Sequence, residues 1–129
     1  MDEKIQHALQ KDRLIDITTL GRKSQQPRRI EIWFHRVGDR LYITGTPGQR
    51  SWLANLKAHP GFTFHLKESY QADLPARARP VEDEAERRPI LAAILSRLGH
   101  SGDLEDWVRD SPLVEVEILD SPSLGATRD

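Results

Sequence analysis

The sequence predicts a mainly β fold, a small antiparallel barrel with peripheral helices. About six short segments alternate apolar and polar residues with the period of two that is typical of half-buried strands. Most of these segments are separated by short polar turns, whereas a doubly wound parallel sheet needs a helix between successive strands. With 129 residues, the chain is long enough to bury one hydrophobic core.

The first half of the chain is expected to form a helix followed by three strands. A short helix over residues 2–12 precedes a strand over 14–20. In the next strand, over 28–36, Ile30, Ile32 and Phe34 share one face and polar residues alternate with them. A turn at 37–39 leads to a strand over 40–46, and such short polar turns are typical of an antiparallel meander.

The second half is expected to add three strands and three helices. Ser51 should cap a helix that runs to about residue 59, and strands follow over 62–66 and 70–79. Pro75 cannot donate a backbone hydrogen bond, which predicts a sheet edge or a bulge there. A helix over 82–98 has an acidic start, and its charge run from Glu82 to Arg88 is expected to be a solvated face. A short helix over 104–109 and a strand over 114–118 complete a single domain over 1–120, with a disordered tail over 121–129.

The composition excludes several classes of site. There are no cysteines, which excludes disulfides, thiolate nucleophiles and cysteine-ligated metals. The histidines lack the i, i+4 spacing of a zinc site, so no metal site is expected, although His35 and His65 on one sheet face leave a haem role open. No histidine is placed beside Ser24, Ser51 or Asp16, which argues against a hydrolytic triad. No apolar run approaches ~20 residues and the N-terminus lacks a signal-peptide core, so a cytoplasmic protein without a membrane span is expected.

Positive charge is concentrated in one stretch of the chain. Residues 21–40 carry a net charge of +4, whereas residues 100–129 carry −6. Within TTLGRKSQQPRR, over residues 18–29, four cations lie in a turn between two predicted strands. Such a turn suits a multiply charged anion, because arginine matches phosphate oxygens in pairs and turn N–H groups donate to them. A solvated hairpin tip is the plain alternative, and nucleic acid is not expected because its binders spread positive charge more widely.

Three pieces of sequence resemble a known family. They are TT-x-GRKS-x-x-PR at residues 18–28, a glycine-containing loop after the third predicted strand, and W-x-x-NL-x-A-x-P at residues 52–60. Over residues 14–79 the chain resembles the deazaflavin (F420)-dependent nitroreductase family. That family belongs to the flavin/deazaflavin oxidoreductases with a split β-barrel, related to pyridoxamine-phosphate-oxidase-like proteins. The resemblance implies a split β-barrel, a homodimer, and hydride transfer with F420, or alternatively FMN, to a small organic substrate.

The resemblance also implies where the cofactor would bind. The basic hairpin would hold its phosphate and, in F420, its acidic tail, through Arg22, Lys23, Ser24 and Arg28. The glycine loop would lie beside the ring, through Thr44, Gly45, Thr46 and Gly48. The helix packed under that loop would contribute Trp52 and Asn55. The cofactor supplies the redox chemistry, so no catalytic residue is assigned.

The chain departs from the family pattern at several positions. Glu31 follows the PR dipeptide and would repel an acidic tail if it faced the cofactor. Pro47 stands where nitroreductase members often carry lysine, the loop is about four residues shorter, and Arg50 is a candidate replacement cation. The stretch 98–107 has no tyrosine. These departures leave an alternative open, a binding protein without redox activity that holds a lipid, haem or another small ligand.

Trp33 is predicted on the polar face of its strand. A tryptophan there favours an interface between two copies over a pocket wall. Tyr42 and Trp107 are expected in the core or at its rim.

Overall fold

The structure is a computed structural model and describes residues 2–99 and 103–119. The element order is helix, three strands, helix, two strands, two helices and a final strand. The bounds are α1 Glu3–Lys11, β1 Leu14–Leu20, β2 Pro27–Val37, β3 Arg40–Thr44, α2 Ser51–Ala58, β4 Gly61–Leu66, β5 Ala72–Pro80, α3 Glu84–Leu98, α4 Leu104–Asp110 and β6 Leu113–Ile118.

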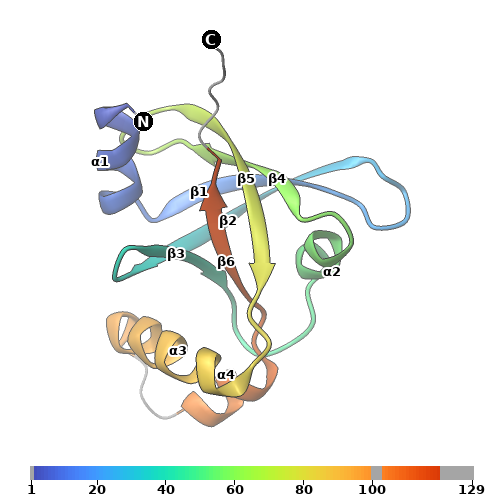
Figure 1. The fold of residues 1–129 in the computed structure, drawn as a ribbon, viewed down its shortest axis with the longest axis vertical. Coiled ribbons are helices and arrows are strands. Elements are labelled where there is room, and N and C mark those ends of the chain that lie inside the picture. Colours follow the sequence, from blue (N-terminus) through green and yellow to red (C-terminus); the bar gives the residue numbers. More distant parts are fainter. Residues whose placement is uncertain (1, 100–102, 120–129) are drawn as a thin grey trace.

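The six strands close into one antiparallel barrel in the order β1-β2-β3-β6-β5-β4 (Figure 1). The predicted meander of β1, β2 and β3 is confirmed by the registers Ile15↔Ile32 and His35↔Tyr42. The last strand does not extend the meander at its end but lies between β3 and β5. The mainly β barrel with peripheral helices is therefore confirmed.

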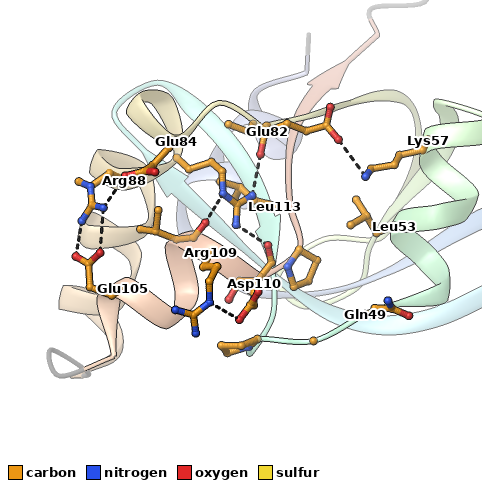
Figure 2. Close-up of a pocket in the computed structure, with 17 residues that line it drawn as sticks. Gln49, Leu53, Lys57, Glu82, Glu84, Arg88, Glu105, Arg109, Asp110 and Leu113 are labelled. Atoms are coloured by element: carbon orange, nitrogen blue, oxygen red, sulfur yellow. Dashed lines mark hydrogen bonds and ion pairs between the residues drawn. The ribbon is translucent and has the colours of Figure 1, made fainter.

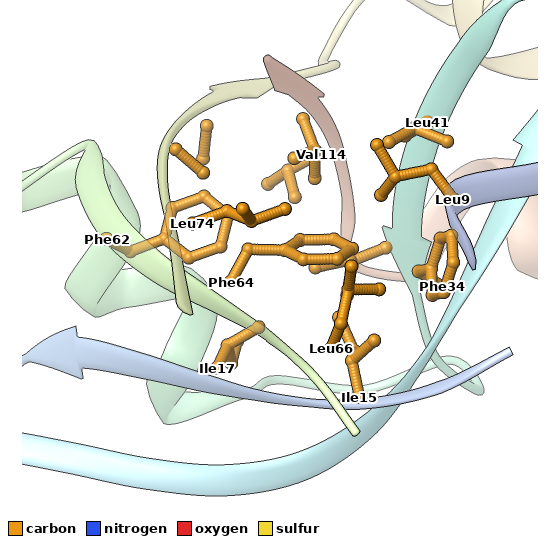
Figure 3. Close-up of a cluster of buried hydrophobic side chains, with 14 of the residues drawn as sticks. Leu9, Ile15, Ile17, Phe34, Leu41, Phe62, Phe64, Leu66, Leu74 and Val114 are labelled. Carbon is orange, nitrogen blue, oxygen red and sulfur yellow. The ribbon is translucent and has the colours of Figure 1, made fainter. Parts of the chain in front are cut away.

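The barrel interior is filled by the inward-facing positions of all six strands (Figure 3). Phe34 and Phe64 meet edge to face at its centre, with ring centroids 5.2 Å apart. Helix α1 adds Ala8 and Leu9 to this core, and α2 adds Trp52 and Leu56. Burying these side chains supplies the main driving force for closing the barrel.

Helices α3 and α4 pack on the outside of the barrel. Tyr42, on β3, points away from the interior and joins a second apolar cluster that includes Leu91 and Trp107 from the two helices. Asp83 caps α3 by accepting a hydrogen bond from the Glu86 N–H at 3.0 Å. The expectation that Tyr42 and Trp107 are core residues is confirmed.

The structure corrects the predicted cap of α2 and clarifies the prediction at Pro75. Ser51 is the first residue of α2, and Arg50 occupies the N-cap position without a side-chain hydrogen bond. Pro75 lies at no bulge, because β5 pairs with β4 in an unbroken register. On its other side the paired register with β6 begins only at Ala76, so the edge that proline predicts is present there. The Leu119 N–H donates to the Pro75 carbonyl at 2.8 Å, so the missing proline N–H faces the end of β6, just beyond its last paired residue.

The predicted tail, 121–129, lies outside the described residues. No helix in the described part of the chain is long and apolar enough to cross a membrane.

Candidate functional site

The basic hairpin joins β1 to β2 and projects beyond the barrel (Figure 1). Its base is closed by the Gly21 N–H, which donates to the Gln26 carbonyl at 2.9 Å. Gln25 has a left-handed φ of 56°, and its N–H returns to the Gly21 carbonyl at 2.9 Å. A Cβ on Gly21 would lie 2.4 Å from the Ser24 hydroxyl, which itself accepts from the Gln26 N–H at 3.2 Å. A side chain at Gly21 would therefore have to displace the Ser24 hydroxyl from its place in the turn.

Asn55 ties the hairpin to helix α2. Its side-chain carbonyl accepts from the Arg22 N–H at 3.0 Å, and its amide donates to the Thr19 hydroxyl at 3.2 Å. Asn55 and Thr19 are both buried, so each would carry an unsatisfied polar group without the other. This contact fixes the orientation of the turn relative to the first half of α2.

A cavity of about 530 Å³ lies between the hairpin and α2. Arg22, Lys23 and Arg28 line it, and none of the three forms an ion pair with another described residue. Its remaining walls are Thr19, Gly21, Ser24, Ile30, Ser51, Trp52 and Asn55. We call this the hairpin cavity. It combines unneutralised cations with hydroxyl groups, the N-terminus of α2 and two apolar walls.

The two faces of β2 separate the cavity from a network of ion pairs. Arg28 and Ile30 face the cavity, whereas Arg29 and Glu31 alternate onto the other face. Arg29 pairs with Asp16 at 2.9 Å, and Lys67 bridges Asp16 and Glu31. Hydrogen bonds from Lys67 are the largest of the effects that hold the pKa of Asp16 below its usual value. Glu31 is thus partnered by Lys67 and does not line the hairpin cavity.

The glycine loop folds around Arg50 instead of lining the hairpin cavity. The Arg50 guanidinium donates to the Thr46 carbonyl at 3.0 Å and to the Thr46 hydroxyl at 2.9 Å. A Cβ on Gly45 or on Gly48 would approach the same guanidinium to 3.3 or 3.1 Å. Thr44 is buried and donates to the Pro112 carbonyl at 2.6 Å. Arg50 therefore organises the loop in this structure and is not part of the basic cluster of the hairpin.

A second cavity, of about 870 Å³, lies on the other side of α2 (Figure 2). Leu53 and Lys57 of α2 form one wall, and the segment Pro47–Gln49 forms another. Residues at the start of α3, residues of α4 and the segments just before α3 and just after α4 form the rest. Its charged side chains are partnered within the described chain. The pairs are Lys57–Glu82 at 3.0 Å, Arg88–Glu84 at 2.9 Å, Arg88–Glu105 at 2.6 Å and Arg109–Asp110 at 2.9 Å.

Arg87 also lines the second cavity and is buried, so the expectation that residues 82–88 form a solvated face is wrong at this position. Its guanidinium donates to four backbone carbonyls, those of Val81, Trp107, Val108 and Ser111, at 2.6 to 3.1 Å. Burial lowers the pKa of Arg87. These bonds tie α3 to the end of α4 and to Val81, which precedes α3. They also supply a donor to the carbonyls of Val108 and of the C-cap residue Ser111 at the end of α4.

The histidines do not form a metal site in the described residues. Both ring nitrogens of His65 are engaged, with the Thr18 hydroxyl and with Asp73, each at 2.7 Å. This hydroxyl–imidazole–carboxylate order resembles a triad that sequence reasoning missed, yet none of the cavities described above is lined by its members. His35 is buried beside α3, and its pKa is lowered to about 4, chiefly by burial and further by Arg97 and Arg13.

The structure thus gathers part of the predicted site. Arg22, Lys23, Ser24, Arg28, Trp52 and Asn55 meet at the hairpin cavity. Gly48 lines the second cavity, and Thr44, Gly45, Thr46 and Arg50 line neither of the two. The cavity walls that the predicted site residues did not include are Thr19, Gly21, Ile30 and Ser51. The alternation of apolar and polar residues could have predicted Thr19 and Ile30. They lie on the inward face of β1 and β2, at the end of each strand that borders the cavity.

A sequence profile of F420H(2)-dependent quinone reductases matches residues 1–102, which include the hairpin, the glycine loop and α2. The chain belongs to this family. Membership of the F420H(2)-dependent quinone reductase family confirms the resemblance drawn from the GRKS and W-x-x-NL pieces.

Solved structures confirm the split-barrel fold expected of this family. A putative pyridoxamine 5'-phosphate oxidase from Listeria innocua has 16% identity, with 92% of this chain and 98% of that chain covered and a TM-score of 0.63. The haem storage protein HutZ from Vibrio cholerae also has 16% identity, with 93% and 91% covered and a TM-score of 0.67. An FAD-binding protein from Mesorhizobium loti has 16% identity, with 89% and 87% covered and a TM-score of 0.64. At these identities the likeness concerns the fold.

Proposed function

We propose that the chain is an oxidoreductase that binds F420 in the hairpin cavity and passes hydride to a small organic acceptor. The observation that carries the proposal is the convergence of Arg22, Lys23 and Arg28 on one cavity in which no carboxylate of the described residues neutralises them. Cations at a cavity wall are stabilised when an anion occupies it.

The residues present fit the phosphate-bearing part of such a cofactor. Arg28 and Arg22 offer planar donors, Lys23 offers a point charge, and the Ser24 and Ser51 hydroxyls can donate beside them. Ser51 also opens α2, whose N-terminus favours negative charge. Ile30 and Trp52 supply apolar surface for the uncharged part of the molecule. The deazaflavin itself supplies the hydride chemistry, and the chain binds and orients it.

The number of cations favours F420 over FMN. A phosphate monoester carries about −1.5 to −2 at neutral pH, which two cations can neutralise. A third cation suits a ligand whose acidic tail adds further charge, as in F420. The family description points to the same cofactor. Its name also makes quinones the first class of hydride acceptor to test.

Contacts between the ring and Thr44, Gly45, Thr46 and Gly48 remain a proposal that rests on the family resemblance. The loop that carries them leads directly into the first turn of α2, where Ser51 and Trp52 line the hairpin cavity. Homodimer formation is also proposed, with Trp33, whose exposed fraction is 47%, as the interface residue.

Fluorescence titration with F420, and separately with FMN, tests the proposal. Arg28→Glu should weaken F420 binding by about 100-fold, because it removes charged hydrogen bonds worth ~1.5–3 kcal/mol and adds repulsion. Arg36→Glu is the matched control, since it makes the same charge change on the same strand but lies outside the hairpin cavity. Equal affinities of the Arg28→Glu variant and the wild type, with both chains folded by circular dichroism, would contradict the assignment.

The second candidate is a binding protein without redox activity, for a lipid, haem or another small ligand. A haem storage protein and an FAD-binding protein share this barrel, which supports the second candidate. Pro47 and the absence of tyrosine from the sequence of residues 98–107 also support it. For haem, His65 is poorly suited because both of its nitrogens are engaged. Failure of F420 and FMN to bind, together with a co-purified lipid or haem, would favour this candidate.

A further inference from the structure

One edge of β2 is left without a neighbouring strand. Residues 27–33 pair with β1 on one side, whereas the register with β3 begins only at Phe34. No other strand of the described chain pairs with this stretch. Pro27 to Glu31 are all exposed, and the hairpin to which they belong projects from the barrel (Figure 1). The stretch is therefore an accessible strand edge, which we call the free edge.

The direction of the backbone groups follows from the register. The Phe34 N–H donates to the Arg13 carbonyl at 2.9 Å, toward β1. Because successive residues of an antiparallel strand point their N–H and C=O groups to opposite sides, Ile32, Ile30 and Arg28 also bond toward β1. The N–H and C=O groups of Arg29 and Glu31 therefore point out of the free edge. Such groups are a template for pairing with another strand.

The free edge is bounded symmetrically. At one end Pro27 has no N–H to donate, and at the other end β3 takes over at Phe34. The residues between these limits centre on Ile30. If two copies paired antiparallel about this residue, Arg29 of each copy would lie opposite the partner's Glu31. Opposite charges at directly facing positions stabilise an antiparallel pair, and like charges destabilise it.

We propose that the free edge of β2 pairs with the same edge of a second copy of this chain, with Ile30 opposite the partner's Ile30. In this register the outward N–H and C=O groups of Arg29 and Glu31 all find partners. The exposed side chain of Ile30, at 36%, would be covered by the partner's Ile30, and Trp33 would face the partner's Pro27. The proposal does not depend on the identity of the cofactor.

Charged residues and proline are also used by proteins to keep strand edges from pairing. What favours self-pairing here is the arrangement of the charges. A protective edge carries charges of one sign, which repel in a second copy, whereas Arg29 and Glu31 have opposite signs and are equidistant from Ile30 in the sequence. The edge is therefore complementary to itself in one register.

Cysteine cross-linking tests this register directly, because the sequence contains no cysteine. Facing Cα atoms of a non-hydrogen-bonded antiparallel pair lie about 4.5 Å apart, within disulfide range. Ile30→Cys should therefore form a covalent dimer under mild oxidation. Leu20→Cys is the matched control, since Leu20 has a similar exposed fraction, 39%, but lies on β1, away from the free edge. Cross-linking of both variants to the same extent, or of neither, would overturn the proposal.

A charge exchange tests the same pairing in solution. By sedimentation equilibrium, Arg29→Glu and Glu31→Arg should each raise the dimer dissociation constant about 10-fold, because each places like charges opposite one another twice. The double exchange should return the constant to near the wild-type value. It does not restore the internal pair between Lys67 and residue 31, so recovery of dimer affinity is attributed to contacts between copies. A wild-type chain that stays monomeric at about 1 mM, or a double exchange as weak as the single ones, would overturn the proposal.

Discussion

The two cavities that flank α2 contain similar residues in opposite electrostatic states. In the hairpin cavity, Arg22, Lys23 and Arg28 have no carboxylate partner among the described residues. In the second cavity, Lys57, Arg88 and Arg109 are each paired with a carboxylate, and Arg87 is held by carbonyls (Figure 2). The difference teaches that cavity volume is a poor guide to function, because the larger cavity has already neutralised its own charges. The following predictions test this contrast between the hairpin side and the helix side of the molecule.

The largest effect is expected from Arg87→Leu on the helix side. It removes the donor from four buried carbonyls, of which only that of Trp107 keeps a second donor among the described residues, the Ser111 N–H. We expect the free energy of unfolding to fall by about 4 kcal/mol, measured by urea denaturation. Arg87→Lys keeps the charge and can still donate to some, though not all, of the four carbonyls. Its loss of stability should therefore be smaller than that of Arg87→Leu. If Arg87 instead served a ligand, Arg87→Leu would abolish ligand binding with little change in stability.

Lowering the pH should also reduce stability, through His35 on the helix side of the molecule. Because His35 has a folded pKa of about 4 against 6.5 in a model peptide, the unfolded chain takes up a proton first as the pH falls. The free energy of unfolding is therefore unaffected by protonation of His35 above pH 6.5, and it falls by up to ~3 kcal/mol as the pH drops from 6.5 to about 4. In His35→Gln this part of the pH dependence of unfolding should disappear. His7→Gln, an exposed control, should retain it.

On the hairpin side, Asn55→Ala should reduce stability by about 1.5 kcal/mol and weaken F420 binding by about 10-fold. The reason is that the Arg22 N–H and the Thr19 hydroxyl lose the group that positions the turn. A stability loss with unchanged binding would show that Asn55 does not position the cofactor site.

The smallest effect is expected from Arg88→Ala. Its pairs with Glu84 and Glu105 are exposed to solvent, and such pairs contribute little to the free energy of unfolding. F420 binding should also be unchanged. A loss of affinity comparable to that of Arg28→Glu would break the contrast between the cavities and assign a ligand to the helix side.

Most of the fold could be predicted from local sequence. Period-two alternation located all six strands, and the apolar stripe of residues 90–98 located α3. Proline predicted an edge or a bulge at Pro75, and the structure has no bulge there but places the missing donor where the neighbouring strand β6 ends. The insertion of β6 between β3 and β5 depends on contacts between residues distant in sequence, which alternation does not record.

The candidate site was predictable only where one short segment builds it. The hairpin carries Arg22, Lys23 and Ser24 in consecutive positions, so their common location follows from the turn alone. The role of Arg50 depends on the conformation of the glycine loop, which folds around the Arg50 guanidinium. The burial of Arg87 depends on where α4 ends relative to α3. In the sequence, Arg87 cannot be distinguished from its exposed charged neighbours.

The central position of β6 has a consequence for synthesis of the chain. Until residues 113–118 leave the ribosome, β3 and β5 each lack a neighbour, and the hydrophobic interior has an open side. The hairpin, α2 and the other five strands are translated before that moment. The barrel therefore closes as one of the last events of folding, and a nascent chain stalled before Leu113 would present one open edge of β3 and one of β5 to other molecules.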